Sequence, residues 1–293
     1  MNMKKWVALL MAAVLAVGML AACGGGGGGK GDIMVCFSSD PETVDPALNS
    51  TVDGSTLIHN AFAGIYGWDK DSAGNPIVVP ECAEALVEPT ELPDGKFEYV
   101  FQLRDGLKWS DGEAMKASDF TYAWNRAVDP KTLADYQAIF GVIDGYDDVN
   151  PNLNISADDE ANTVTVVTTA YCAYFDELMA FPTFFPVRQD IVEANPDGWA
   201  TDVASYISNG PFKMSEWTVG SSIKYVKNEH YWNADKVKLD SLTFALSADD
   251  DANFVNFKNG TYKFLYNVPQ QMIPEFIEER LGTRFFIGEY VGN

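Results

Sequence analysis

Histidine, cysteine and acidic side chains could do chemistry in this chain, but their spacing matches no enzyme motif that we can name. The two histidines, His59 and His230, lie in separate segments. No serine motif of the G-x-S-x-G type and no metal motif of the H-E-x-x-H type occurs. Among the 42 acidic residues no pair stands out by its spacing. We therefore expect no catalytic residue, no cofactor and two structural histidines; an exported hydrolase with paired carboxylates is the rival hypothesis.

The cysteines and the acidic segment between residues 144 and 159 give no metal site either. No two of the cysteines Cys36, Cys82 and Cys172 stand at the spacing of metal ligands. Buried free thiols are the favoured interpretation, and one disulfide with one thiol left over is the alternative. The aspartates of the acidic segment do not follow the ligand order of a calcium loop, so we expect a solvated acidic surface there.

The first thirty residues have the pattern of a lipoprotein leader. Lys4 and Lys5 precede an apolar run that is short for a membrane span, and the run closes on Leu20-Ala21-Ala22-Cys23. This ending is a lipobox, in which the thiol of Cys23 becomes the lipid attachment point. Six glycines follow and suit a flexible tether. We predict a signal peptide over 1–23, a tether over 24–30 and a domain held at the outer face of a membrane through Cys23. An ordinary cleaved signal, or a single anchor helix with a chance cysteine, is the alternative.

Composition limits the remaining possibilities. The formal net charge is −22, and removal of the leader takes away two more positive charges. A protein so acidic will not bind nucleic acid or anionic lipid through its overall field. Hydrophobic residues make up 47% of the chain, which is ample for a packed core. The roughly 260 residues beyond the tether suggest two domains or one large one.

Residues 97–127 change their hydrophobic period and so predict a strand followed by a helix. Apolar and polar side chains alternate over 97–103, as in a half-buried strand. Turn residues follow at 104–106 and at 109–112. An amphipathic stripe then recurs at Phe120, Ala123, Trp124 and Ala127. The side chain of Lys116 cannot cap this helix, so the helix is predicted to begin at Ser118 or to depend on Asp119 alone.

Five further elements are predicted from local pattern. Residues 33–37 and 163–169 have the composition of strands. Residues 56–65 and 131–143 have helical patterns. A third helix is predicted over 249–258, closed by Gly260.

The strings LRDGLKWSDGE and ASDFTYAWNRAVDP, which begin at Leu103 and Ala117, resemble a known family segment. That segment marks the family 5 extracellular solute-binding proteins, the peptide-binding receptors of ABC importers. FPTFFP at 181–186 and NGPFK at 209–213 resemble two further passages of the family. The resemblance covers residues 32–293 but only part of the family's fold. It therefore implies the N-terminal portion of an oligopeptide-binding lipoprotein.

The resemblance also implies candidate ligand contacts. In the family the first strand delivers an acidic or polar loop to the ligand cleft, and Asp40 and Glu42 occupy that loop here. A later turn approaches the ligand, which makes Asn209 and Gly210 further candidates. A carboxylate such as Asp40 could offset the ammonium group of a peptide. A purely structural role is the alternative for all four residues.

The fold that the resemblance implies is α/β and periplasmic-binding-protein-like, of the class II type. Mixed sheets and helices form two lobes, and a third domain is missing from this chain. Residues 31–52 begin lobe I, 53–170 form lobe II, and 171–293 return to lobe I. The expected function is capture of oligopeptides, by a monomer, for delivery to a membrane ABC permease. A receptor of the same fold for a nickel complex or a sugar, or a sensor lipoprotein without transport, is the alternative.

Overall fold

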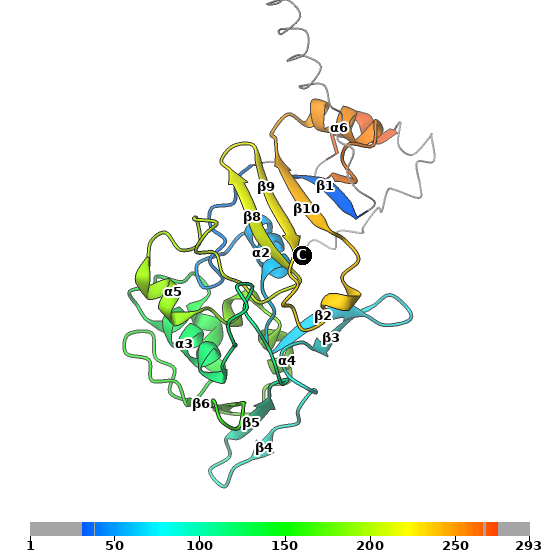
Figure 1. Ribbon diagram of the computed structural model, residues 1–293. Coiled ribbons are helices and arrows are strands. Elements are labelled where there is room, and N and C mark those ends of the chain that lie inside the picture. Colours follow the sequence, from blue (N-terminus) through cyan, green and yellow to red (C-terminus); the bar gives the residue numbers. More distant parts are fainter. Residues whose placement is uncertain (1–30, 38, 266–267, 275–293) are drawn as a thin grey trace, which may run out of the picture.

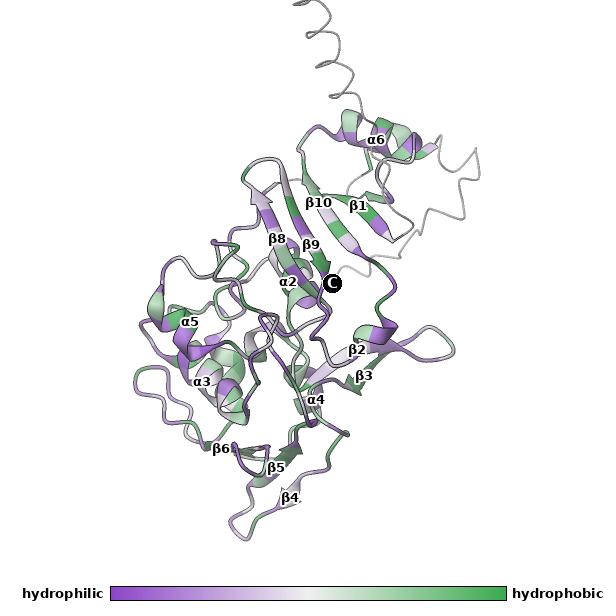
Figure 2. Cartoon of the chain, viewed as in Figure 1, coloured by the Kyte–Doolittle hydropathy of each residue, from purple (hydrophilic) through white to green (hydrophobic). Residues whose placement is uncertain are grey.

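The computed structural model describes residues 31–37, 39–265 and 268–274. These residues form three β-sheets, and helices contact each of them (Figure 1). Hydrophobic and hydrophilic residues are interleaved along α3 and the strands (Figure 2), as expected of elements that each turn one side to a core. The predicted α/β class with mixed sheets is confirmed.

The largest sheet has five strands in the order β11-β1-β10-β9-β8. The first strand β1 runs parallel to both its neighbours, whereas β10, β9 and β8 are antiparallel in succession. The bounds are β1 (Asp32–Phe37), β8 (Phe212–Thr218), β9 (Ser222–Lys227), β10 (Ser241–Leu246) and β11 (Phe264–Leu265). The parallel pairing of β1 with β10 and β11 brings segments that are far apart in sequence into one sheet.

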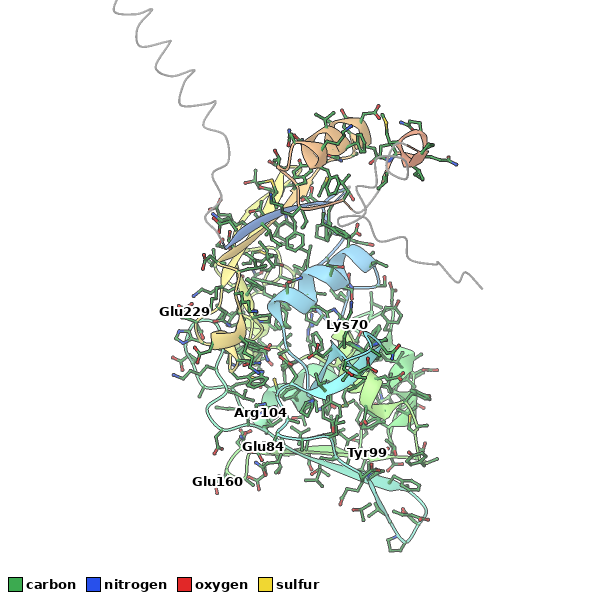
Figure 3. All side chains as sticks on the ribbon, turned by 90° about the vertical axis from the view of Figure 1, so that its right-hand side faces the viewer. Lys70, Glu84, Tyr99, Arg104, Glu160 and Glu229 are labelled. Atoms are coloured by element: carbon green, nitrogen blue, oxygen red, sulfur yellow. The ribbon has the colours of Figure 1, made fainter. Side chains whose placement is uncertain are left out.

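Helices cover the two faces of this sheet. On one face Cys36 packs with Phe254 and Phe257 of α6 (Asp250–Lys258). On the other lies α2 (Val52–Ala61), which contacts β8. Figures 1 and 3 both show α2 between this sheet and the rest of the molecule. The site described below is built on α2.

The second part of the fold is a four-stranded antiparallel sheet with a helix against it. Its strand order is β4-β5-β7-β6, and α3 (Ala117–Val128) contacts β6 and β7. The strands are β4 (Thr90–Glu91), β5 (Phe97–Gln102), β6 (Ile155–Asp158) and β7 (Thr163–Thr168). A separate hairpin is formed by β2 (Tyr66–Lys70) and β3 (Pro76–Pro80). The strand and helix predicted from the period change at 97–127 are thus confirmed.

Short helices complete the chain. Two are α-helical, α4 (Phe175–Met179) and α5 (Gln189–Ala194). The 3-10 helices are η1 (Gln137–Val142), η2 (Pro182–Phe184), η3 (Ala234–Lys236) and η4 (Gln270–Met272). No helix within the described residues is both long enough and apolar enough to cross a membrane.

Two of the predicted helices differ from the observed ones, and a third matches one of its two predicted alternatives. The helix predicted at 56–65 begins at Val52, because the Thr51 hydroxyl accepts the Gly54 N–H and caps it. The helix predicted over 131–143 is only η1, and Leu133 has a φ of 55°, which no right-handed helix allows. Helix α3 begins at Ala117, where the Lys116 N–H donates to Asp119 Oδ2 at 2.8 Å. Asp119 therefore caps it, as one of the two alternatives predicted.

One hydrophobic core runs through both parts of the fold. It includes Phe37 and Leu246 of the five-stranded sheet together with Tyr99 and Val166 of the four-stranded sheet. This core crosses the predicted lobe boundaries at 52/53 and 170/171, which stay predictions. Because the two parts share buried side chains, they are expected to move as one body.

Candidate functional site

The loop after β1 carries two of the predicted ligand contacts, and the structure anchors one of them. The Asp40 carboxylate accepts the Trp217 Nε1–H at 3.0 Å and the Gly220 N–H at 2.7 Å, so it is tied to the β8–β9 hairpin. Glu42 is exposed to solvent. Neither residue lines the hollows described below. A direct ligand contact by either residue stays a prediction.

A buried ion pair fastens the same loop to α3. Asp45 is 2% exposed, and its carboxylate receives two bonds from the Arg126 guanidinium, at 3.0 and 2.5 Å. Burial works against the charge on Arg126, but the Asp45 carboxylate outweighs it and raises the pKa of Arg126. The Tyr206 hydroxyl donates to Val44 O at 3.0 Å. These contacts fix the path of the chain just before α2.

The other two predicted contacts, Asn209 and Gly210, lie just beyond the C-terminal end of α2 and have structural partners there. Asn209 is 4% exposed, accepts the Ala63 N–H and donates to Ala63 O, both at 2.9 Å. The Gly210 N–H donates to Ala61 O at 2.7 Å, and a Cβ on Gly210 would lie 2.6 Å from that oxygen. This close approach explains the glycine. Ligand contact by either residue stays a prediction without support from this geometry.

The structure does not bring the two predicted pairs together. Asn209 and Gly210 precede β8, whereas the groups that hold Asp40 are Trp217 and Gly220 at its other end. A seven-residue strand spans roughly 20 Å. The four residues therefore cannot form a single contact point.

A trough along the exposed side of α2 is the best candidate site. Its larger hollow has a volume of about 490 Å³, within the range of ligand pockets. Its smaller hollow, of about 280 Å³, is bounded by α2 and three strands. Thr56 and Asn60 line both, so the two hollows adjoin. The larger is lined by Asn49, Ser50, Thr51, Val52, Ser55, Thr56, His59, Asn60, Tyr136, Phe181 and Pro182; the smaller by Val35, Phe37, Thr56, Asn60, Leu242, Phe244 and Phe264.

The two hollows differ in chemistry. The smaller is apolar apart from Thr56 and Asn60, and Phe264 on the edge strand β11 is 52% exposed. The larger combines hydroxyl and amide groups with two aromatic rings, Tyr136 and Phe181, whose centroids lie 5.1 Å apart. Such a mixed surface suits a ligand that has both polar and apolar parts.

Several polar groups of the larger hollow are fixed by α2 itself. Asn60 Nδ2 donates to Thr56 O at 2.8 Å, and the Thr56 hydroxyl donates to Val52 O at 2.9 Å. His59 Nδ1 lies 2.8 Å from Ser55 O. No described residue bonds to Asn60 Oδ1 or to the Tyr136 hydroxyl, so both are available to a ligand.

Sequence reasoning does not find the residues of this trough. A helix start placed at Thr56 leaves out the capped turn from Thr51. With the start at Val52, the residues Val52, Ser55, Thr56 and His59 fall at i, i+3, i+4 and i+7 and share one side of the helix. No local signal indicates that Tyr136 and Phe181 would face it. The sequence predicts only a structural role for His59, whereas in the structure His59 lines the larger hollow.

A buried polar junction joins the β2–β3 hairpin to the segment before η3. Glu81 Oε1 accepts the Tyr231 hydroxyl and the Trp232 Nε1–H. Burial raises the pKa of Glu81, although both of these bonds and Arg104 oppose the shift. The Arg104 guanidinium lies 3.9 Å from the centre of the Trp232 ring and donates to Glu81 O. Arg104 is labelled in Figure 3. This junction fastens the β2–β3 hairpin to the segment between β9 and β10 of the five-stranded sheet.

The described cysteines are free thiols, and the described residues contain no candidate metal cluster. Cys36, Cys82 and Cys172 are buried free thiols, as the favoured interpretation predicted, and the disulfide alternative fails. Burial raises the pKa of each of these thiols. Within residues 31–37, 39–265 and 268–274, no group of three His, Cys, Asp or Glu side chains could hold a metal ion. The predicted signal peptide, the predicted tether and Cys23 lie outside the described residues.

The mixed sheets and the trough beside the first strand define a protein of the periplasmic-binding type. The chain belongs to the bacterial extracellular solute-binding proteins of family 5, because the model "Bacterial extracellular solute-binding proteins, family 5 Middle" matches residues 78–288. The predicted family and fold are confirmed.

Individual relatives agree with this family. The oligopeptide-binding protein OppA of Bacillus subtilis is 33% identical over 258 residues, which are 84% of this chain and 45% of that protein. The solved structure of Burkholderia pseudomallei OppA has a TM-score of 0.76 at 28% identity, covering 86% of this chain and 49% of its own. Haemophilus influenzae OppA in complex with the peptide RPPGFSPFR has a TM-score of 0.76 at 26% identity, covering 87% and 50%. The chain thus spans about half the length of these relatives.

Proposed function

We propose that this chain is part of a lipid-anchored extracytoplasmic receptor that captures oligopeptides and delivers them to the permease of an ABC importer. The observation that carries the proposal is the trough along α2, in a family whose similar members are named as oligopeptide-binding proteins. The lipobox ending at Cys23 supports the anchor. The acidic net charge supports a role without nucleic acid.

Peptide capture fits the chemistry of the trough. A receptor for peptides of many sequences must bind their backbone through polar groups and leave side chains in roomy, hydrated pockets. The free acceptor on Asn60 and the Tyr136 hydroxyl supply polar groups, and the two hollows supply room. Asp40 and Glu42 reach the ligand, in this proposal, from the loop before α2.

The shared core supports a proposal about how the chain takes part in closure. In this proposal the described residues of the predicted segments act together as one rigid wall of the cleft, and the opposite wall is supplied by protein outside the described residues. Closure of that second wall over the trough would hide the peptide from water, and the closed form is what a permease would recognise. We propose a monomer as the binding unit.

Calorimetric titration with a library of short peptides tests the proposal. It compares the soluble chain from Gly31 with the mature product of the complete gene. Binding by the complete product, and loss of peptide uptake when the gene is deleted, would support a transport receptor. Binding without any loss of uptake would indicate a sensor. Failure of the complete product to bind any peptide would refute peptide capture and favour another solute.

The lipid anchor has its own test. Cys23→Ser removes the thiol that would carry the lipid, so the mature protein is expected in the soluble fraction. Mass spectrometry of the wild-type N-terminus should show a lipid on Cys23. An unmodified Cys23, or a mature wild-type chain that begins at another residue, would refute the anchor while leaving peptide capture untouched.

A further inference from the structure

The larger hollow of the trough combines polar and aromatic groups with one carboxylate, Asp135, beside it. None of the residues that line it is a lysine or an arginine. We propose that this hollow is a subsite for a cationic side chain, lysine or arginine, of the bound peptide. The inference rests on the proposed peptide-binding function and adds a preference to it.

The aromatic pair at the hollow supplies the first attraction. Tyr136 and Phe181 meet edge to face, with their ring planes at 84°. In this arrangement the faces of the ring that points edge-on are not covered by its partner. A lysine ammonium or an arginine guanidinium within about 6 Å of such a face is attracted by the ring quadrupole.

An acidic group without a cationic partner supplies the second attraction. The Ser50 hydroxyl, which lines the hollow, donates to Asp135 Oδ2 at 2.6 Å, and this places the Asp135 carboxylate at the rim. Asp135 forms no ion pair with any lysine or arginine of the described chain. Asp45, in contrast, is already neutralised by Arg126. A charge that is exposed and unpaired can be offered to a ligand.

The surroundings add to both attractions. Asn60 Oδ1 can accept a hydrogen bond from an ammonium group, and the Tyr136 hydroxyl oxygen can do the same. The net charge of −22 raises the local concentration of cationic ligands near the whole surface. Because this general field acts on every cation, the experiment must separate it from the local effect of the hollow.

Matched peptides measure the preference. Calorimetry on the mature product of the complete gene would compare peptides of equal length that differ only by lysine or norleucine at one position, scanned along the peptide. At the position that enters the hollow, lysine is expected to bind about twofold to thirtyfold tighter than norleucine. Raising the salt concentration should reduce this ratio.

Four variants test whether the hollow causes the preference. Tyr136→Leu and Asp135→Asn should lower the lysine-to-norleucine ratio, while Tyr136→Phe, which keeps the ring, should retain most of it. Glu160→Gln removes the same unit of charge from an exposed position at the end of the molecule away from α6 (Figure 3), so it should leave the ratio unchanged.

The outcomes separate this inference from the function on which it rests. Peptides bound with equal affinity for lysine and norleucine at every position would overturn the cationic subsite and leave the peptide receptor intact. A preference that survives both Tyr136→Leu and Asp135→Asn, or that falls equally in Glu160→Gln, would place its origin outside the hollow. Failure to bind any peptide would overturn both proposals.

Discussion

The ion pair between Asp45 and Arg126 holds the loop before α2 in place. The variant Asp45→Asn should therefore lower the free energy of unfolding strongly. The variant keeps the shape of the side chain but leaves the Arg126 guanidinium buried without a counter-charge. Asp45 is 2% exposed, and the Arg126 side chain is 13% exposed. The amide oxygen of the substituted side chain could still accept the Ala47 N–H, which Asp45 Oδ1 accepts at 2.9 Å.

The size of the effect follows from this burial. Removing one partner of a buried ion pair costs about 3–5 kcal/mol, because the other charge remains out of water. The retained acceptor for Ala47 favours the lower end, so the free energy of unfolding should fall by about 3 kcal/mol. For a protein of this size each kcal/mol moves the melting temperature by roughly 2–4 °C, which gives a fall of roughly 6–12 °C.

Thermal unfolding followed by circular dichroism measures the change, with an exposed ion pair as control. Lys213 and Glu229 lie 2.8 Å apart with side chains 28% and 61% exposed, so Lys213→Gln should cost about 0–1 kcal/mol. The double variant Asp45→Asn with Arg126→Met removes both charges and should recover much of the loss. A fall below about 1 kcal/mol for Asp45→Asn, or no recovery in the double variant, would refute the reasoning.

Three further predictions concern the loop, the end of α2 and the junction. Asn209→Ala leaves the buried Ala63 N–H without a partner and leaves Ala63 O with only the weak Cys82 thiol donor at 3.6 Å, so the free energy of unfolding should fall by about 1–3 kcal/mol. A large loss of peptide affinity with full stability would instead make Asn209 a ligand contact. Asp40→Ala removes the acceptor of the Trp217 Nε1–H and the Gly220 N–H, so the free energy of unfolding in urea should fall by about 1–3 kcal/mol. An unchanged peptide dissociation constant would show that Asp40 is not a ligand contact. Burial raises the pKa of Glu81, so its contribution to stability is full below the unfolded-state pKa and is lost as the pH rises through the folded-state pKa. Glu81→Gln should therefore raise the melting temperature at pH 7 relative to wild type, with a gain that shrinks on acidification; a gain independent of pH would contradict this assignment.

Local pattern predicts the elements well where a strong period coincides with a clear cap or turn. The alternation over 97–103 and the stripe from Phe120 to Ala127 correspond to β5 and α3 because one side of each faces a core. Asp249 and Gly260 enclose α6 in the predicted place. The start of α2 escapes prediction because its first turn has few apolar residues, and only the Thr51 cap marks it.

The sequence predicts the candidate site less well than it predicts the helices and strands. Asp40 and Glu42 are found through a family resemblance, and their loop does precede α2. Asn209 and Gly210 are in the expected turn, yet their polar atoms serve Ala63 and Ala61. Spacing cannot distinguish these uses, because a turn that approaches a ligand and a turn that caps a helix contain the same residue types.

The sequence by itself determined the family, the α/β class, the leader pattern and the absence of a recognisable catalytic motif. These depend on local strings and on composition, which folding does not change. Only the tertiary structure showed that Ser50, His59, Tyr136 and Phe181 line one hollow and that Asp45 is neutralised while Asp135 is not. Contacts between residues far apart in the sequence depend on how the sheets and helices pack, and that packing is a property of the whole core.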